Sequence, residues 1–440
     1  MRVLWLAGWY PHTKNPLGGN FVRRHFWAVA NHESVIQPNS TKDASNTVDP
    51  NFENQKTNER GSENVELYHF APYFYGDKKP QVLYSRIPIS GERLNLEKAE
   101  KLGKSDVLEQ KHQNQLEHII PVLQFRGSVG FLNLLLYYVK VFSVLAGLLR
   151  ANWDIVHVHA ADKIGFAAAA LKHFFGFQLW LTEHWAIFGQ DVPDAYEKRG
   201  WWFRFSYRYM WNRVDMAASI TANLHRSMCA ILKREVPLIS LQNALDIDFV
   251  AQIEDPIIRE RPASEFRFLH VSNGEKRKNV FELVKAFEVF SKSHPNAELI
   301  LIGSESHAQY ANLKGVTALG GLPPRELAEY YKNTSALILV SDAENAPCVI
   351  LEALCFGLPV IVTQVGGVSE MCSEDNAIQI PSFQTHEEKA EKIYEALLGF
   401  AAKNPTFDSV LIQHQALEKF HPQKVGLGLR MAYANQKCAE

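Results

Sequence analysis

Short apolar runs alternate along the chain with stretches of helical periodicity, and this alternation predicts an α/β architecture. Runs typical of buried parallel strands lie at 3–7, 155–159, 179–182, 238–241, 266–272, 297–302, 336–340 and 360–363. Helices are expected from about residue 21 and over 164–175, 280–292, 325–332, about 347–356 and 420–436. Since strands and helices alternate, each unit should be a doubly wound parallel sheet.

The length of the chain predicts two domains. At 440 residues it exceeds what one hydrophobic core usually supports. The regular pattern breaks at about 249–265, which is expected to be the linker. We therefore place an N-terminal domain at 1–248 and a C-terminal domain at 249–419.

Two polar segments interrupt the first half. Residues 39–64 are almost free of large apolar side chains, so they are expected to form an exposed, mobile insertion. Residues 91–117 have the composition of a surface helix. The segment 130–149 is strongly apolar, but Lys140 interrupts it, and a lysine at the bilayer centre costs about 3 kcal/mol. A buried helix is favoured there, with a helix lying on a membrane surface as the alternative.

Residues 198–213 interleave five basic with seven aromatic residues. Such a mixture suits stacking on bases or a position at a membrane interface. At helical spacing, however, Trp202, Phe205 and Tyr209 are expected to form a stripe that faces the core, with the arginines toward solvent. The membrane interface stays open as the alternative.

Composition and charge exclude some classes of function. The net charge of −2 and a pI near 6.8 give no global case for nucleic acid binding. The five cysteines show no C-x-x-C spacing, so we expect reduced thiols in a cytoplasmic protein and no structural metal. The first residues are interrupted by glycine and proline and do not resemble a signal peptide.

The densest run of special residue types is 341–370. It predicts a strand, a loop, a helix that begins near Pro347, a second strand and a glycine-containing loop. Because ligands bind at the carboxyl ends of strands in open α/β sheets, the loops 341–346 and 364–370 should line one pocket, which includes Asn345, Gly366 and Gly367.

Two glutamates stand in this run, Glu344 and Glu352, with seven residues between them. A rise of about 1.5 Å per residue separates their backbones by roughly 10 Å. That spacing argues against a glycosidase pair, whose carboxylates face each other across about 5 Å. We expect the two glutamates to hold different ends of one extended ligand.

These motifs resemble those of the family 4 retaining glycosyltransferases, also called group 1, which have the GT-B fold of two Rossmann-like domains facing across a cleft. The resemblance rests on Glu344, Glu352 and the Gly366-Gly367-x-x-Glu370 segment. It implies that Glu344 contacts the donor sugar and Glu352 the ribose of the nucleotide. It also implies that a C-terminal helix at about 420–440 packs back onto the first domain.

Further segments of the chain are similar to the same family. The loop with Gly18 and Gly19 looks like the one beside the donor diphosphate, where glycines let the backbone approach a phosphate. The 182–185 segment makes His184 a candidate contact of the donor sugar or a phosphate. His157 and His159 alternate along one strand and therefore share a face, so a role in the core is as well supported for them.

The family's diphosphate-binding lysine corresponds to Lys278, whose charge would stabilise the departing nucleotide. Asn273 stands where the family has an arginine, which leaves Lys276 or Arg277 to supply a second positive charge. Asn243 lies in a segment similar to the family's domain junction.

Three further residues, Asp246, Ile247 and Asp248, form a D-x-D motif. We reject a metal clamp there, because two carboxylates without further oxygen ligands make a poor divalent site.

The resemblance implies transfer of a hexose from a nucleoside diphosphate sugar to an acceptor hydroxyl with retention, without metal or cofactor. Lys278, Glu344 and His184 are then the expected catalytic residues. The expected partners are the nucleotide sugar and a saccharide or lipid-linked acceptor, in cell-surface polysaccharide or glycolipid assembly. The enzyme is expected in the cytoplasm, with possible peripheral contact to the inner membrane face. Two alternatives are a nucleotide-sugar epimerase or phosphorylase of the same fold, and a non-catalytic sugar-binding partner in a polysaccharide assembly complex.

Overall fold

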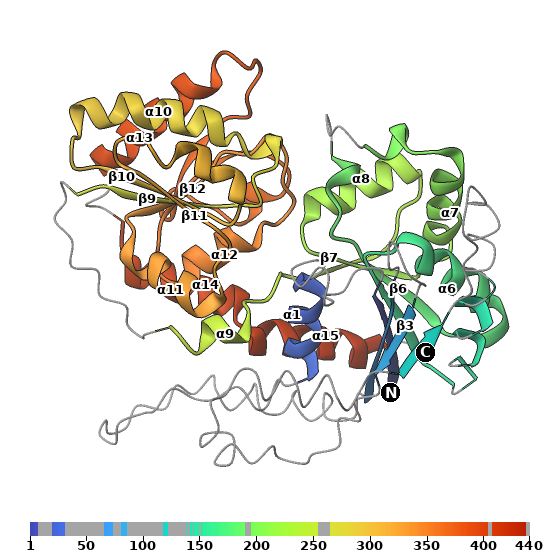
Figure 1. The fold of residues 1–440 in the computed structure, drawn as a ribbon. Coiled ribbons are helices and arrows are strands. Elements are labelled where there is room, and N and C mark those ends of the chain that lie inside the picture. The colour runs from blue at the N-terminus through green and yellow to red at the C-terminus, as the bar shows by residue number, and fades with distance from the viewer. Residues whose placement is uncertain are drawn as a thin grey trace, which may run out of the picture.

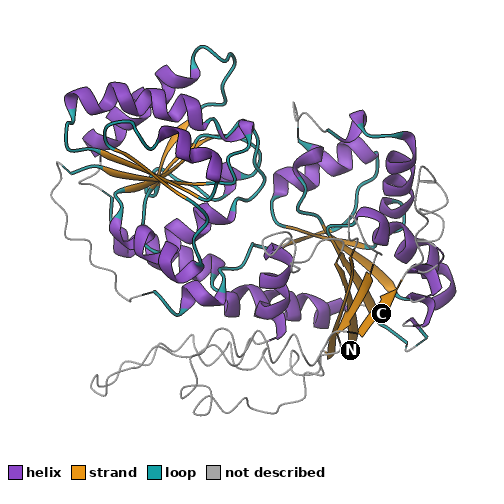
Figure 2. Ribbon diagram, viewed as in Figure 1, coloured by secondary structure: helices purple, strands orange, loops and turns teal. Residues whose placement is uncertain are grey.

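In a computed structural model, the chain forms two α/β domains side by side, each built on its own sheet (Figures 1 and 2). The structure describes residues 1–7, 20–30, 66–73, 81–85, 118–121, 139, 141–143, 145–147, 149–150, 152–189, 195–253, 265–403 and 407–436. Gly18, Gly19 and the segments 39–64 and 91–117 lie outside these ranges, so the expectations for them stay predictions.

The N-terminal sheet has eight strands in the order β4-β3-β2-β1-β5-β6-β7-β8. The strands are β1 Arg2–Ala7, β2 Glu66–Tyr73, β3 Gln81–Ser85, β4 His118–Pro121, β5 Ile155–His159, β6 Gln178–Thr182, β7 Met216–Ser219 and β8 Leu238–Ser240. Six of them pair in parallel, and β3 and β4 add an antiparallel edge. The helices are α1 Asn20–Ala30, α6 Asp162–Phe175, α7 Trp201–Trp211 and α8 Ala222–Leu232.

The C-terminal sheet has six parallel strands in the order β11-β10-β9-β12-β13-β14. The strands are β9 Arg267–Val271, β10 Glu298–Ile302, β11 Val316–Leu319, β12 Ala336–Leu339, β13 Val360–Thr363 and β14 Ala377–Ile380. The helices are α10 Val280–Ser293, α11 Pro324–Asn333, α12 Cys348–Cys355, α13 Lys389–Lys403 and α14 Ser409–Phe420, and the short α9 Ile247–Val250 lies before the sheet in sequence. Buried side chains cover both faces of the sheet, as a parallel sheet requires.

The strand order reverses at β9, which lies between β10 and β12. At such a switch point the two connections leave in opposite directions and open a crevice at the carboxyl ends of the strands. A ligand site is therefore expected at the loops after β9 and β12. The two-domain α/β fold expected from the sequence is confirmed.

The chain ends in α15 Pro422–Gln436, which packs against α1 at the N-terminal domain (Figure 1). Arg430 Nη1 donates a hydrogen bond to the carbonyl of Val29 at 3.1 Å. The Tyr433 hydroxyl pairs with His157 Nδ1 on β5, and both side chains are fully buried. The last helix thus completes the core that the first strands begin.

Where the structure describes the predicted elements, their bounds agree within a few residues. Pro347 is the residue before α12 rather than a residue of its first turn. Several elements were not predicted, namely β2, β3, β4, β7, β11, β14, α8, α13 and α14.

The prediction that Phe205 faces the core is wrong. Its side chain is 49% exposed, whereas Trp202 and Tyr209 are partly buried and pack beside Phe166. The helical periodicity of α7 therefore places aromatic residues on its outer face as well as its inner one. Among the described residues, no helix has the length and apolar character needed to cross a membrane.

Gly426 allows the close packing of α15 on α1 and provides a test of it. A Cβ at this position would lie 1.9 Å from the carbonyl oxygen of Ala28, whereas one at Gly428 meets nothing within 4 Å. We expect Gly426→Ala to lower the free energy of unfolding by about 1–3 kcal/mol through overpacking. The matched control, Gly428→Ala, should be neutral or stabilise by up to about 1 kcal/mol. Urea unfolding of both variants measures this, and equal effects would contradict the packing.

Candidate active site

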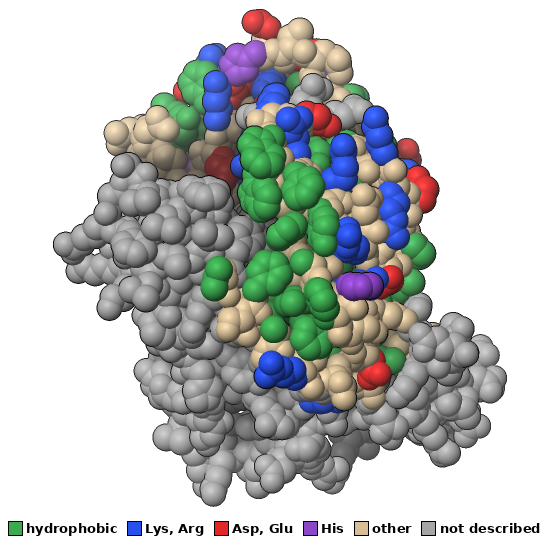
Figure 3. All heavy atoms as spheres, turned by 90° about the vertical axis from the view of Figure 1, so that its right-hand side faces the viewer, with side chains coloured by type: hydrophobic (Ala, Val, Ile, Leu, Met, Phe, Trp, Pro, Cys, Tyr) green, Lys and Arg blue, Asp and Glu red, His purple; other side chains and the backbone are tan. Residues whose placement is uncertain are grey.

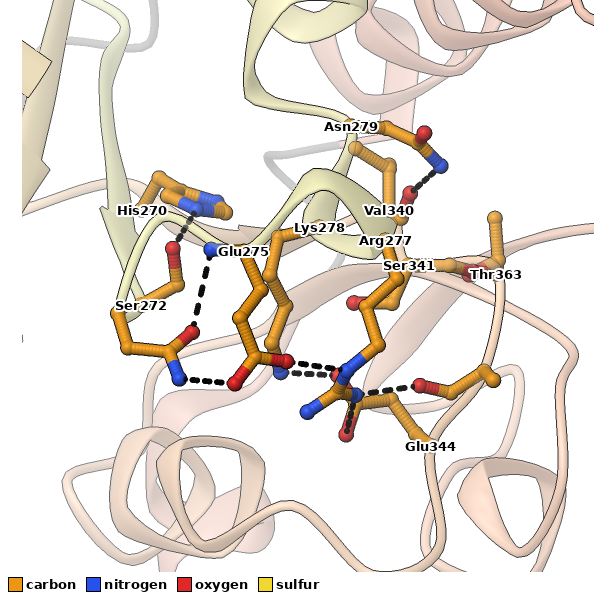
Figure 4. A network of polar contacts seen from close by, with 12 residues as sticks. His270, Ser272, Glu275, Arg277, Lys278, Asn279, Val340, Ser341, Glu344 and Thr363 are labelled. Atoms are coloured by element: carbon orange, nitrogen blue, oxygen red, sulfur yellow. Dashed lines mark hydrogen bonds and ion pairs between the residues drawn. The ribbon is translucent and has the colours of Figure 1, made fainter. Parts of the chain in front are cut away.

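A charged cluster lies at the carboxyl ends of β9 and β12 (Figure 4). The Lys278 ammonium forms an ion pair with Glu344, and the side chains of both are about nine-tenths buried. Arg277 Nη1 lies 3.5 Å from the other Glu344 oxygen and donates to the carbonyl of Ala343 at 2.7 Å. Arg277 Nε also pairs with Glu275 at 2.6 Å. Two cations and one carboxylate therefore converge at the switch point.

Asn279 fixes the turn that presents Lys278. It has a left-handed backbone with φ of 51°, and its side-chain amide donates to the carbonyl of Val340 and to Asp342, both at 2.8 Å. Lys389 binds the same carboxylate at 2.7 Å. The Lys276–Lys278 turn is thereby tied to the end of β12. Asn279 was not predicted as a site residue, because its partners Val340 and Asp342 lie far away in the sequence.

Glu352 is 3% exposed and has partners from both domains. Arg24 Nη1 from α1 lies 2.7 Å from its Oε1, and the Tyr331 hydroxyl donates to its Oε2 at 2.8 Å. Arg24 Nε also pairs with Asp246 at 3.1 Å. Burial by itself lowers the pKa of Arg24, but the charges of Glu352 and its neighbours, with the hydrogen bond to Glu352, together outweigh burial and the net pKa is raised. Glu352 thus lies at the contact between the domains, apart from the cluster around Glu344.

The loops after β12 and β13 meet the N-terminal domain at a tight seam. The Thr221 hydroxyl donates to Asn345 Oδ1 at 2.8 Å, and Asn243 donates to the carbonyl of Ala346 at 2.8 Å. A Cβ on Gly367 would lie 2.2 Å from Thr221 Cγ2, so only glycine permits this approach. The predicted residues Asn345, Gly367 and Asn243 therefore come together at the seam.

Glu370 joins the same seam. Its two carboxylate oxygens accept the backbone N–H groups of Ala222 and Asn223 at 2.8 and 2.7 Å, at the N-terminus of α8. A carboxylate is favoured at that end of a helix by its exposed N–H groups. Gly366 has φ of 55°, and a Cβ there would overlap the carbonyl of Glu344, so it sets the course of the loop. The sequence analysis missed Thr221 and the α8 terminus because it predicted no element there.

His184 lies on the N-terminal side of the seam, after β6. Its ring stacks on Phe21 of α1 with centroids 4.1 Å apart, and Asn345 Nδ2 donates to its carbonyl at 3.4 Å. Burial lowers the pKa of His184 well below its usual value, and nearby His25 and His157 lower it further. The imidazole is therefore neutral near pH 7, able to donate or accept a hydrogen bond without carrying charge.

The loop that carries His184 is held by the buried carboxyl group of Glu183. It accepts the backbone N–H groups of His184 at 2.8 Å and Trp185 at 3.0 Å, and the hydroxyl of Tyr207 on α7 donates to it. Burial raises the pKa of Glu183, although these hydrogen bonds act in the opposite direction. The position of His184 thus depends on α7.

Four histidines line up behind the seam. His157 and His159 share one face of β5, as predicted; their rings lie 4.1 Å apart, and His159 stacks on Trp5. His25 pairs through Nε2 with the carbonyl of Gln242 at 2.8 Å. Ring nitrogens of His25, His159 and His184 lie within 4.8 Å of one another, so these are the described residues near the site with the donor set for a transition metal. The expectation of no metal stays a prediction.

Comparison with known proteins finds a family match in the C-terminal domain. Residues 252–400 match the family model described as glycosyl transferases group 1. The matched range contains the C-terminal sheet and the Lys278–Glu344 ion pair. It is 26% identical over 229 residues to a putative teichuronic acid biosynthesis glycosyltransferase of Bacillus subtilis, and 23% identical over 233 residues to an N-acetyl-alpha-D-glucosaminyl L-malate synthase of Bacillus anthracis. Each match covers 50% of this chain, and they span 55% and 59% of those relatives.

Solved structures show the same fold over the whole chain. A sucrose-phosphate synthase of Thermosynechococcus elongatus aligns with a TM-score of 0.61 at 15% identity, covering 100% of both chains. HepE of Anabaena, solved in complex with UDP, aligns with a TM-score of 0.58 at 15% identity, covering 99% of this chain and 100% of its own. The GT-B fold, expected from the motifs, is confirmed, and the match of residues 252–400 supports the resemblance to group 1.

The buried histidines predict how stability depends on pH. Burial lowers the pKa of His25 to about 4 and of His270 to about 3, each from an ordinary 6.5. Between pH 6.5 and these values the unfolded chain binds protons that the folded chain does not. The free energy of unfolding should therefore fall as the pH falls, by about 1.4 kcal/mol per pH unit for each such histidine.

Urea unfolding from neutral pH to about pH 5 measures this slope. His270→Gln should remove about 1.4 kcal/mol per pH unit of it. The control His173→Gln, at an exposed position on α6, should leave the slope unchanged. An identical slope in both variants would show that His270 does not contribute.

Proposed function

We propose that this protein transfers a hexose from a nucleoside diphosphate sugar to an acceptor hydroxyl, with retention of configuration and without a metal. The convergence of Lys278 and Arg277 on Glu344 at the switch point carries the proposal. Departure of a nucleoside diphosphate concentrates negative charge, and pre-positioned cations stabilise that charge most when they are partly buried. Asn273 stands where the family has an arginine, and Arg277 would supply this second positive charge beside Lys278.

The contacts support the following roles. Lys278 and Arg277 would bind the diphosphate, and Glu344, released from one of its cations, would accept hydrogen bonds from hydroxyls of the donor sugar. His184, neutral and held by the Glu183 loop, would face the same sugar from the N-terminal domain. Asn345, which donates a hydrogen bond to the His184 carbonyl, would link the N-terminal and C-terminal sides of the site.

Glu352 would bind the ribose hydroxyls of the nucleotide. Because Arg24 and Tyr331 already hold its two oxygens, the ribose would displace or share one of these partners. Gly366 and Gly367 would let the backbone approach the donor, Asn243 would support the adjoining loop through Ala346, and Gly18 and Gly19 would lie beside the diphosphate. Lys278, Glu344 and His184 are the proposed catalytic residues.

The printed names of similar proteins guide the substrate class. HepE was solved with UDP and with UDP-glucose, and the Bacillus subtilis relative is named for teichuronic acid biosynthesis. These names support a nucleotide sugar as donor and a saccharide or lipid-linked acceptor in cell-surface glycan assembly. We place the reaction in the cytoplasm, with no cofactor beyond the nucleotide sugar as co-substrate.

Calorimetric titration with UDP, GDP and ADP tests the proposal. We expect one nucleotide to bind at micromolar concentration. In Glu352→Gln its affinity should fall by about 10- to 100-fold, since hydrogen bonds to charged groups contribute about 1.5–3 kcal/mol. The control Glu391→Gln, at an exposed position on α13, should bind as the wild type does.

Two outcomes would contradict the assignment. If no nucleotide binds to the folded wild type, the transferase proposal fails. If one binds equally well to the wild type and to Glu352→Gln, the donor site stands but the ribose role of Glu352 is wrong. Thermal unfolding of the variant, compared with the wild type, shows whether lost binding reflects lost folding.

A further inference from the structure

The outer face of α7 presents aromatic and basic side chains to solvent. Trp201, Arg204, Phe205 and Arg208 recur at helical spacing and are exposed, with Trp201 at 72% and Phe205 at 49%. The opposite side of the helix is buried, so α7 has the periodicity of a surface helix with an unusual outer face. Large aromatic side chains gathered on a surface mark an interaction site.

This apolar surface continues onto neighbouring helices. The Phe166 ring of α6 lies between Trp202 and Phe142, with centroid distances of 5.5 and 6.4 Å, and Val139 nearby in sequence is 59% exposed. Figure 3 shows hydrophobic side chains gathered in a band on this side of the molecule, with lysines and arginines along its edge. We call the set Val139, Phe142, Phe166, Trp201, Trp202 and Phe205 the aromatic face.

The charge on the helix α7 itself has one sign. It contains Arg204 and Arg208 and no acidic residue. Lys198 and Arg199 lie just before it, beside one acidic residue, Glu197, and Arg150 is exposed at the end of the 139–149 segment. Tryptophan at the level of the headgroups, flanked by arginine, is the composition of a helix that lies in a membrane interface. The surface of an anionic membrane offers apolar contact to the aromatic side chains and negative charge to the basic ones.

We propose that the aromatic face docks this protein on the surface of an anionic phospholipid bilayer. Trp201 and Phe205 insert among the headgroups, and Arg204 and Arg208 pair with lipid phosphates. The inner side of α7 holds the His184 loop through Tyr207 and Glu183, so the docked helix belongs to the wall of the candidate site. This proposal depends only on the aromatic face and does not require the proposed transfer reaction.

Co-sedimentation of the full chain with vesicles tests the docking. Vesicles of equal parts phosphatidylcholine and phosphatidylglycerol are compared with phosphatidylcholine alone, without nucleotide. We expect binding to the anionic vesicles that weakens with salt. The pair Arg204→Gln and Arg208→Gln should weaken it about 30-fold, because each arginine near such a surface contributes about 1 kcal/mol. The pair Trp201→Ser and Phe205→Ser should weaken it by about tenfold or more.

Phe281→Ser is the matched control. Phe281 is an exposed aromatic residue on α10, 50% exposed, with the Lys285 ammonium 4.3 Å from its ring centroid, but it lies in the other domain. Its substitution should leave vesicle binding unchanged. Equal loss in the control and in the α7 variants would overturn the proposal, since it would indicate general stickiness.

Further measurements distinguish other occupants of the aromatic face. Absence of vesicle binding overturns the proposal, and a labelled single-stranded RNA that binds instead would assign the face to nucleic acid. A dimer in light scattering that Trp201→Ser with Phe205→Ser converts to monomer, without vesicle binding, would assign it to a second copy. Nucleotide titration of the same variants, without lipid, separates failure of the docking from failure of the proposed reaction.

Discussion

The buried guanidinium of Arg24 is the constraint on which the arrangement of the two domains depends. It comes from α1, and its carboxylate partners are Glu352 of α12 and Asp246 at the domain junction. Removing one partner from such a buried pair costs about 3–5 kcal/mol, because the remaining charge stays uncompensated. The helix α1 that carries Arg24 is itself held by the last helix of the chain. The helices α1 and α15 therefore set the contact between the two domains together.

The two sides of the domain contact differ in their electrostatics. On the C-terminal side, charge is concentrated in Lys278, Arg277 and Glu344 at the ends of β9 and β12. On the N-terminal side, the imidazoles near His184 are neutral, since burial lowers the pKa of His25, His157 and His184. A ligand with a highly charged part and a neutral polar part fits this division, and a nucleoside diphosphate sugar is such a ligand. Glu344 and Glu352, which pair with the cations described above, are also the carboxylates proposed to bind the donor, so donor binding would exchange one set of partners for another.

The seam between the domains explains the small residues near the site. Gly367 permits contact with Thr221, and Glu370 reaches the N-terminus of α8, so the glycine-containing loop contributes to domain contact as well as to the candidate pocket. The helix α7 has two functional sides. Tyr207 on its inner side holds the His184 loop, and the aromatic face lies on its outer side.

The sequence by itself determined the alternation of buried strands and helices, the two-domain class and the resemblance to group 1 glycosyltransferases, because apolar periodicity and the Glu344 to Glu370 motifs are local signals. It also indicated Lys278 and left Arg277 open as a second cation. Only the tertiary structure decided that Arg24 pairs with Glu352, that Thr221 meets Gly367, and that Phe205 faces solvent. These contacts join segments far apart in the chain, or depend on which face of a helix a neighbour covers. No local pattern of residues encodes either.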